Sequence, residues 1–213
     1  MREHTDGENA FSREQGALAA AIVPSGRFPL GAPVPDAKLL DAHGAATTLY
    51  DEVADRPAVI VLYRGAWCPY CNLTLRTYQQ QLFPRLRSRG AVLIAVSPQK
   101  PDGSLSMVEK NSLEFPVLSD PGNSIARTLG VLTAPSAEAL SVQFEHGLDL
   151  TATNADGTVG LPMPTTAVLD AEGRLRWLDV HPDYTTRSEP DAILDALDHA
   201  RSARAATSTQ QPR

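Results

Sequence analysis

The chain has 213 residues, which is enough for one domain with a substantial core and short for two. Hydrophobic residues make up 42% and charged residues 21% of the sequence, an ordinary balance for a soluble globular protein. The formal net charge of −6 argues against a nucleic acid or an anionic membrane as the partner.

The start of the chain bears on the compartment. No apolar run reaches the roughly 18 residues that a membrane-spanning helix needs. The first residues are polar and carry acids, unlike the apolar centre of a signal peptide, although a short apolar stretch follows at 18–23. We therefore expect a cytoplasmic protein. In that reducing compartment, paired cysteines are more often catalytic or metal-binding than structural.

Residues 1–29 are expected to form an N-terminal extension, with a polar lead, one amphipathic helix and a linker. The Pro- and Gly-rich segment 24–36 favours an extended course over the surface. Two short strands around a turn at 43–44 predict a small hairpin. The main domain is expected over residues 30–203, followed by a disordered tail at 204–213.

The rest of the chain alternates strands and helices in an α/β order. Continuous apolar runs at 58–63 and 91–96 indicate strands that are buried on both faces. Between them, apolar residues recur every three or four positions, which predicts a helix over 69–88 that Pro84 kinks or brings to its last turns. Further elements are expected as helices at 101–111, 123–129, 136–147 and 189–201, and as strands at 115–118, 165–170 and 174–180.

Both cysteines lie in the stretch YRGAWCPYC (63–71), where the first buried strand turns into the long helix. Sites of open α/β sheets tend to form at that end of a strand. The unpaired N–H groups and the dipole of the helix favour a thiolate there, with a pKa below the value of about 8.5 for free cysteine. We expect Cys68 to have the lower pKa and to attack the substrate, because it lies nearer the exposed helix end. Cys71 would then resolve the product as a disulfide.

Four neighbours of the two thiols are expected to shape the site. Pro69 suits the first helical position, because its missing N–H would be unpaired there in any case. Trp67 can cover the thiols with a flat apolar surface, and Arg64 can add positive potential. Tyr70, with Tyr63 and Trp67, either lines a substrate groove or packs as an ordinary aromatic residue.

Other chemistries fit the residues less well. Zinc takes four ligands, but the chain has one Cys pair and five scattered histidines. Inert structural thiols are disfavoured at a strand-to-helix junction. No phosphate-binding loop is present, so we expect neither a metal nor a cofactor. In the later stretch PDYTTR, Asp183, Tyr184 and Arg187 either recognise a partner or form a satisfied turn network, and we favour the turn.

Several segments resemble one superfamily. WCPYC at a strand-to-helix turn resembles the thioredoxin active-site motif, and MPTTAVLD (163–170) resembles the thioredoxin-fold segment in which a cis-proline precedes Thr and a strand. The segments AVSPQKPDG, FPVLSDPGNSIARTLGV, VLDAEGRLRW and HPDYTTRSEPDAILDAL are similar to peroxiredoxin-like proteins of the alkyl hydroperoxide reductase/thiol-specific antioxidant family. The resemblance covers about residues 30–200. It implies a thioredoxin-like fold with a central mixed sheet flanked by helices, and a cis bond before Pro164 that packs against the cysteines. Thr165 either contacts the cysteines beside this bond or is a strand residue chosen for its β propensity, and we favour the strand residue.

The sequence also departs from that family. Typical peroxiredoxins carry Thr three residues and Pro seven residues before the peroxidatic Cys, and an Arg before the later strand. Aligned on Cys71, these positions hold Cys68 and Arg64, and aligning on Cys68 does not restore them. The Arg position falls at Pro164. Leu62 stands where thioredoxins carry a buried acid.

Three functions therefore stay open. Whole-chain resemblance favours a thiol-dependent peroxidase, in which a Cys thiolate reduces hydrogen peroxide or an organic hydroperoxide and the sulfenic acid condenses to a disulfide. Thioredoxin, glutaredoxin or a small thiol would restore the dithiol. The site residues favour a thioredoxin-type oxidoreductase that acts on protein disulfides, with Cys68 attacking and Cys71 resolving. The third is a binding protein that senses oxidation without turnover. A homodimer is compatible with each.

Overall fold

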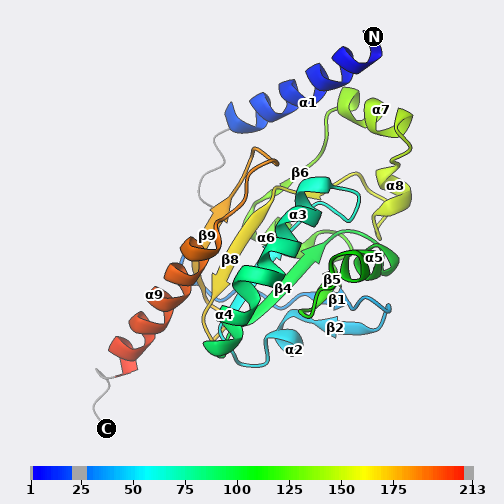
Figure 1. Ribbon diagram of the computed structural model, residues 1–213. Helices are drawn as coiled ribbons and strands as arrows, with labels where there is room; N and C mark the ends of the chain where they lie inside the picture. The colour runs from blue at the N-terminus through cyan, green and yellow to red at the C-terminus, as the bar shows by residue number, and fades with distance from the viewer. Residues whose placement is uncertain (1, 21–27, 209–213) are drawn as a thin grey trace.

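The computed structural model describes residues 2–20 and 28–208 (Figure 1). The first residues of the expected linker and the end of the expected tail lie outside these ranges. Within them, no helix is both long enough and apolar enough to cross a membrane.

A seven-stranded mixed sheet forms the centre of the molecule, in the order β2-β1-β5-β4-β3-β8-β9. Strands β3, β4 and β5 are parallel, whereas β8 runs antiparallel to β3 and β9. The strands are β1 (Lys38–Leu40), β2 (Ala46–Thr48), β3 (Ala58–Leu62), β4 (Val92–Ser97), β5 (Val117–Ser119), β8 (Thr165–Leu169) and β9 (Leu175–Val180). A separate antiparallel pair joins β6 (Leu132–Thr133) to β7 (Leu161–Pro162). The expected α/β fold with a central mixed sheet is confirmed.

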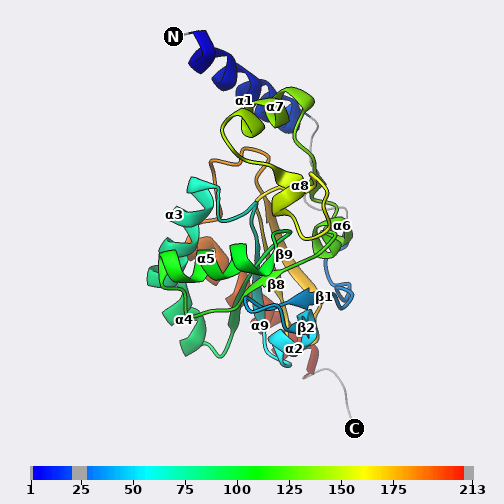
Figure 2. The same cartoon turned by 90° about the vertical axis from the view of Figure 1, so that its right-hand side faces the viewer.

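Helices cover both faces of the sheet (Figure 2). They are α1 (Arg2–Ala20), α2 (Leu49–Val53), α3 (Pro69–Thr77), the π-helical turn η1 (Tyr78–Leu82), α4 (Phe83–Ser88), α5 (Pro101–Asn111), α6 (Ser124–Leu129), α7 (Ala137–Glu145), α8 (Leu150–Thr153) and α9 (Pro190–Ser208). Among them α1 belongs to the expected N-terminal extension and packs on α7. The last helix continues beyond residue 201, where we expected it to end.

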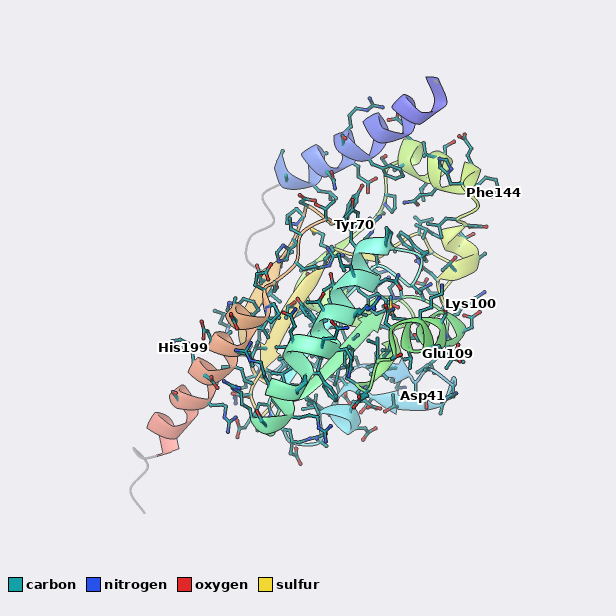
Figure 3. All side chains as sticks on the ribbon, in the orientation of Figure 1. Asp41, Tyr70, Lys100, Glu109, Phe144 and His199 are labelled. Atoms are coloured by element: carbon teal, nitrogen blue, oxygen red, sulfur yellow. The ribbon has the colours of Figure 1, made fainter. Side chains whose placement is uncertain are left out.

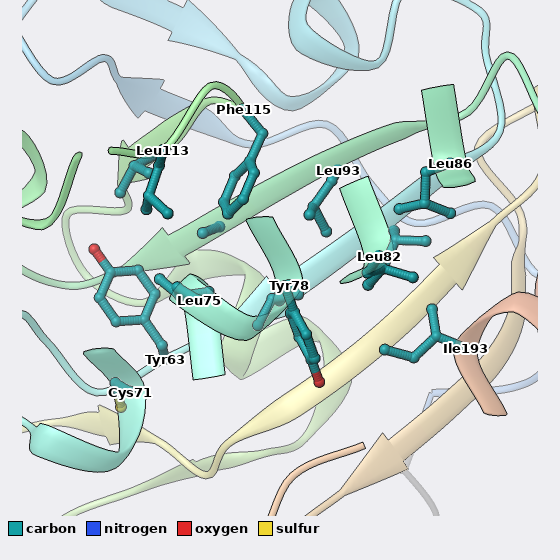
Figure 4. Close-up of a cluster of buried hydrophobic side chains, with 14 of the residues drawn as sticks. Tyr63, Cys71, Leu75, Tyr78, Leu82, Leu86, Leu93, Leu113, Phe115 and Ile193 are labelled. Atoms are coloured by element: carbon teal, nitrogen blue, oxygen red, sulfur yellow. The ribbon is translucent and has the colours of Figure 1, made fainter. Parts of the chain in front are cut away.

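Successive side chains of the central strands point to opposite faces of the sheet, which divides the core into two clusters. On β3, Val59 and Val61 face the cluster beneath α3, α4 and α9, whereas Ile60 and Leu62 face the cluster beneath α2 and α6. Figure 4 shows the first cluster, with Cys71 at its edge. The site is therefore attached to the most deeply buried strands of the domain.

The expected helix over 69–88 is continuous, but it contains the π turn η1 immediately before Pro84. The Phe83 N–H donates to the Tyr78 carbonyl, one residue further back than in an α-helix. Because Pro84 has no N–H and crowds the preceding turn, the helix widens there instead of breaking.

The expected cis bond before Pro164 is wrong, since every peptide bond in the described residues is trans. The Met163 N–H donates to the Val131 carbonyl at 2.9 Å, and the Pro164 carbonyl accepts from the His181 N–H at 2.8 Å. These bonds hold the segment in the trans form, which X–Pro bonds also favour intrinsically.

Candidate functional site

The loop from β3 to α3 carries both cysteines. Gly65 has φ +156°, and a Cβ at this position would collide with the Trp67 indole and the Gln99 amide. The Gln99 Oε1 accepts a hydrogen bond from the Ala66 N–H. Glycine is therefore required for the tight approach that turns the chain from the strand end into the helix.

Helix α3 begins at the two thiols. Cys68 is the N-cap residue in extended conformation, and Pro69 occupies the first helical position as expected. The Asn72 side chain donates to the carbonyls of Ala66 and Cys68 at 2.7 Å and 2.9 Å. Asn111 of α5 in turn donates to the Asn72 Oδ1 at 3.0 Å. These contacts fix the helix start against its neighbours.

Both cysteines are free and almost fully buried, with 2% of Cys68 and 1% of Cys71 exposed. The two thiols interact electrostatically, which favours the proton on Cys68 and the charge on Cys71. The Cys71 Sγ also accepts a hydrogen bond from Nη2 of Arg187, at 3.2 Å. A guanidinium and a thiol beside the same sulfur favour a single negative charge at Cys71.

The pKa values of the two thiols separate accordingly. Burial raises the pKa of Cys71, but the interaction with Cys68 and the charge of Arg187 outweigh it and lower this pKa to about 6. The pKa of Cys68 is raised, first by its interaction with Cys71 and then by burial. The directions of these shifts are the reverse of the expectation that Cys68 has the lower pKa. The Arg187 guanidinium contacts the Cys71 sulfur directly, whereas Arg64 acts on Cys68 without a hydrogen bond to it.

The segment between β9 and α9 holds Arg187 in place. Its Nη1 donates to the carbonyls of Tyr184 and Thr186 at 2.6 Å and 2.5 Å. The next residue, Ser188, donates from its hydroxyl to Asp179 of β9 at 2.7 Å, and its carbonyl accepts from the Tyr78 hydroxyl at 2.5 Å. Arg187 is thus anchored from both its own loop and the long helix.

His181 reinforces the same segment. Its Nε2 lies 3.0 Å from the Asp179 carboxylate, and its Nδ1 lies 2.8 Å from the Thr186 hydroxyl. Asp183 accepts from the N–H and the hydroxyl of Thr185, as expected for a turn. The predicted turn network is therefore present, but Arg187 extends from it to a sulfur atom.

A pocket of about 510 Å³ opens on the other side of the pair, and Cys68 lines it. Trp67 and Tyr70 also line it, as expected for a groove, and Tyr70 lies at the upper end of α3 in Figure 3. The Arg64 guanidinium carbon lies 4.3 Å from the centre of the Tyr184 ring and 5.1 Å from that of Trp67. The pocket therefore combines an apolar surface, a cation and a sulfur.

Three other residues expected at the site do not line the pocket. Tyr63 is buried in the core and does not line the pocket. Pro164 lines a small recess on the far side of Arg64. Thr165 begins β8, pairs with Leu62 and donates its hydroxyl to the Met163 carbonyl at 2.8 Å. Thr165 thus continues the sheet beside the end of β3, where the loop begins.

Sequence reasoning missed Arg187 as a partner of the thiols. It lies 116 positions from Cys71, and no local pattern connects the two. Within the described residues, no group of three or more His, Cys, Asp or Glu side chains could hold a metal ion. The chemistry offered by this arrangement is that of two thiols and a cation.

A thiol pair at the carboxyl end of a central strand, where a helix starts, defines a protein of the thioredoxin-like class. The chain belongs to the AhpC/TSA family, whose model matches residues 30–178.

Two solved structures show the same fold. Peroxidoxin BcpB from Mycobacterium tuberculosis superposes with a TM-score of 0.62 and 20% sequence identity. The match covers 83% of this chain and 98% of that protein. A peroxiredoxin-like protein from Aquifex aeolicus superposes with a TM-score of 0.63 and 16% sequence identity. That match covers 81% of this chain and 88% of the other protein.

The chain is also similar to curated thiol-disulfide oxidoreductases. The thiol-disulfide oxidoreductase ResA of Bacillus thuringiensis is 27% identical over 112 residues, which are 52% of this chain. The ResA of Bacillus anthracis matches to the same extent. The chain spans 63% of the length of these relatives.

Proposed function

We propose that the protein is a thiol-dependent peroxidase that reduces hydrogen peroxide or organic hydroperoxides through a dithiol–disulfide cycle of Cys68 and Cys71. The observation that carries the proposal is the buried thiol pair with the Arg187 guanidinium on the Cys71 sulfur. This guanidinium supplies a cation that the sequence lacks at the usual peroxiredoxin position, where Pro164 stands. Membership of the AhpC/TSA family supports the same activity.

The geometry suggests that the two thiols have different roles in the reaction. Cys68 lines the pocket and reaches the substrate, while Cys71 holds the negative charge. As the Cys68 sulfur attacks one peroxide oxygen, its proton moves to Cys71 and then to the departing oxygen, which leaves as water or an alcohol. The products are a sulfenic acid on Cys68 and a thiolate on Cys71.

Cys71 then closes the cycle. Its thiolate attacks the Cys68 sulfur, and the sulfenic hydroxyl leaves as water after taking one proton from solvent. The peroxide has gained two electrons, and two thiols have become one disulfide. Thioredoxin, glutaredoxin or a small thiol would return the dithiol form by exchange. This cycle suits the cytoplasm, where such donors keep thiols reduced, and a homodimer is compatible with it.

Stopped-flow tryptophan fluorescence of the reduced protein tests the proposal, because Trp67 adjoins Cys68. We expect a phase whose rate rises linearly with hydrogen peroxide or cumene hydroperoxide. Cys68→Ser should abolish it. Cys71→Ser should slow it to the rate of an ordinary thiol, because the proton acceptor is lost. Wild-type rates no faster than those of free cysteine would overturn the peroxidase.

A protein disulfide oxidoreductase is the second candidate. The exposed side chains of Tyr70 and Leu73 beside the pocket could receive an unfolded chain, and the ResA relatives favour this reading. Insulin reduction with a thioredoxin reductase system measures it directly. Rapid insulin reduction without peroxide consumption would select this activity.

Sustained turnover separates both enzymes from a sensor. We expect continued NADPH oxidation when the protein, thioredoxin, thioredoxin reductase and peroxide are mixed. One stoichiometric burst without further consumption would indicate a protein that registers oxidation and does not catalyse it.

A further inference from the structure

The Arg64 side chain is a buried cation that forms no ion pair with any acid whose side chain the structure describes, although Glu14 acts on it electrostatically. Only 6% of the residue is exposed. Among the side chains that the structure describes, its guanidinium makes no hydrogen bond and no ion pair, and it contacts the ring faces of Tyr184 and Trp67. A buried charge is costly unless it is paired, so this guanidinium has unused capacity for an anion.

The same side chain lines the 510 Å³ pocket beside Cys68. The volume lies within the range of small-molecule sites, about 300–1,000 Å³. Its walls are mainly apolar and come from Phe11, Trp67, Pro69, Tyr70, Leu148 and Tyr184. Gln143 also lines it, and the buried Oε1 of this residue has no hydrogen-bond partner in the described part of the chain.

We propose that this pocket binds small organic carboxylates, with the carboxylate on Arg64 and an apolar body along the aromatic walls. A guanidinium presents a planar fork that matches a carboxylate with two parallel hydrogen bonds. Apolar walls add affinity through burial of the rest of the molecule. A ligand seated in this way lies beside the Cys68 thiol.

Glu14 of α1 is the acid that bears on this inference. It lines the recess of about 10 Å³ behind Arg64, and the two side chains interact electrostatically without forming an ion pair. Burial raises the pKa of Glu14, against the lowering effect of Arg64. Glu14 therefore does not neutralise Arg64 by contact, but its charge competes with an incoming carboxylate.

The inference deepens the proposed function and depends on it only for the fate of the bound molecule. A carboxylate that also carries a hydroperoxide would be a substrate, whereas one without it would simply occupy the pocket. Binding can therefore be measured without any redox turnover, and failure of one proposal is distinguishable from failure of the other.

Calorimetric titration of the reduced full-length protein with octanoate, and with the neutral octanamide, tests the site. The two probes have the same chain length, so their difference reports the charge. We expect octanoate to bind at least about tenfold more tightly, because a hydrogen bond to a charged group is stronger than one between neutral groups. Equal affinity for the two probes, or no saturable binding of octanoate, would overturn the inference.

Three variants locate the effect. Arg64→Gln should remove the preference for octanoate, and Arg64→Lys should retain part of it, which guards against a folding defect. Glu14→Gln should strengthen octanoate binding a fewfold by removing the competing charge. His146→Gln is the matched control, because His146 lines the same pocket. A preference that survives Arg64→Gln but disappears in His146→Gln would assign the anion to the histidine and contradict the proposal.

Discussion

The two sides of the thiol pair use the same type of side chain in opposite ways. Arg187 donates to the Cys71 sulfur and to two carbonyls of its own loop, so its described hydrogen bonds are all made within the protein. Arg64 lies between two aromatic rings at the pocket beside Cys68 and bonds to no described partner. A cation paired with a thiol sets reactivity, whereas one left unpaired at a pocket selects a ligand.

Removing the charge of Arg187 tests this contrast between the two arginines, and it should have the largest effect on activity. In Arg187→Gln we expect the pKa of Cys71 to rise from about 6 toward the ordinary value of about 8.5. The thiolate at pH 7 then becomes a minor form, and peroxide reduction at that pH should slow by about tenfold or more. Rates against pH from 5 to 9, with thiolate absorbance at 240 nm, measure both quantities.

Two further observations control this experiment. The activity of Arg187→Gln should recover at pH 9, where Cys71 ionises without help. Arg187→Lys keeps a charge and should lie between the two. An unchanged pH profile in Arg187→Gln would mean that Cys71 does not depend on this guanidinium.

The free energy of unfolding of the reduced protein should also reflect the opposite pKa shifts of the two thiols. Cys71 has a folded pKa below that of an unfolded cysteine, so its contribution is complete above about pH 8.5 and is lost as the pH falls through about 6. Cys68 has a raised pKa, so its contribution is present below about pH 8.5 and is lost at higher pH.

Together, these shifts predict a stability maximum near pH 8.5, with a slope of at most about 1.4 kcal/mol per pH unit on either side. Urea unfolding between pH 6 and 9.5 measures it as the difference between the reduced wild type and Cys68→Ser/Cys71→Ser. The double variant removes the two thiols and keeps every other titrating group. A difference that does not change with pH would contradict the separated pKa values.

Ser188→Ala tests how Arg187 is positioned beside Cys71, and it should have a smaller effect on activity. It removes the hydrogen bond to Asp179 that anchors the Arg187 segment. Such a bond contributes about 0.5–1.5 kcal/mol, so we expect a loss of about threefold in rate at pH 7 and a slight rise in the pKa of Cys71. Thr151→Ala, which removes an exposed hydroxyl bonded to Asp149, is the control. Equal effects of the two changes would deny Ser188 a positioning role.

The sequence predicted the parts of this site that are local. The apolar run before the cysteines indicated a buried strand, and Pro69 marked the helix start, because both signals come from neighbouring residues. The strands β6 and β7 were missed, since two-residue strands carry no periodic pattern. Arg187 was missed for a different reason, because a contact between distant segments is determined by tertiary packing.

The order of the two pKa values differs from the expectation for the same physical reason. Helix position alone favours a thiolate on the residue nearest the exposed end, and that argument selects Cys68. The interaction of Cys71 with Cys68, together with a guanidinium at 3.2 Å from the Cys71 sulfur, outweighs it. Local geometry therefore predicted that a thiolate forms, and only the fold decided on which cysteine.

The π turn η1 sets the rotation of α4 relative to α3, the helix that begins at the two cysteines. Removing one residue from η1 would restore an α-helical turn and rotate α4 by about 100° relative to α3. Leu86 would leave its buried position, or else the first part of the helix would turn away from the segment held by Tyr78. The number of residues in one widened turn thus decides whether Tyr78 can bond to the Ser188 carbonyl while Leu86 stays buried.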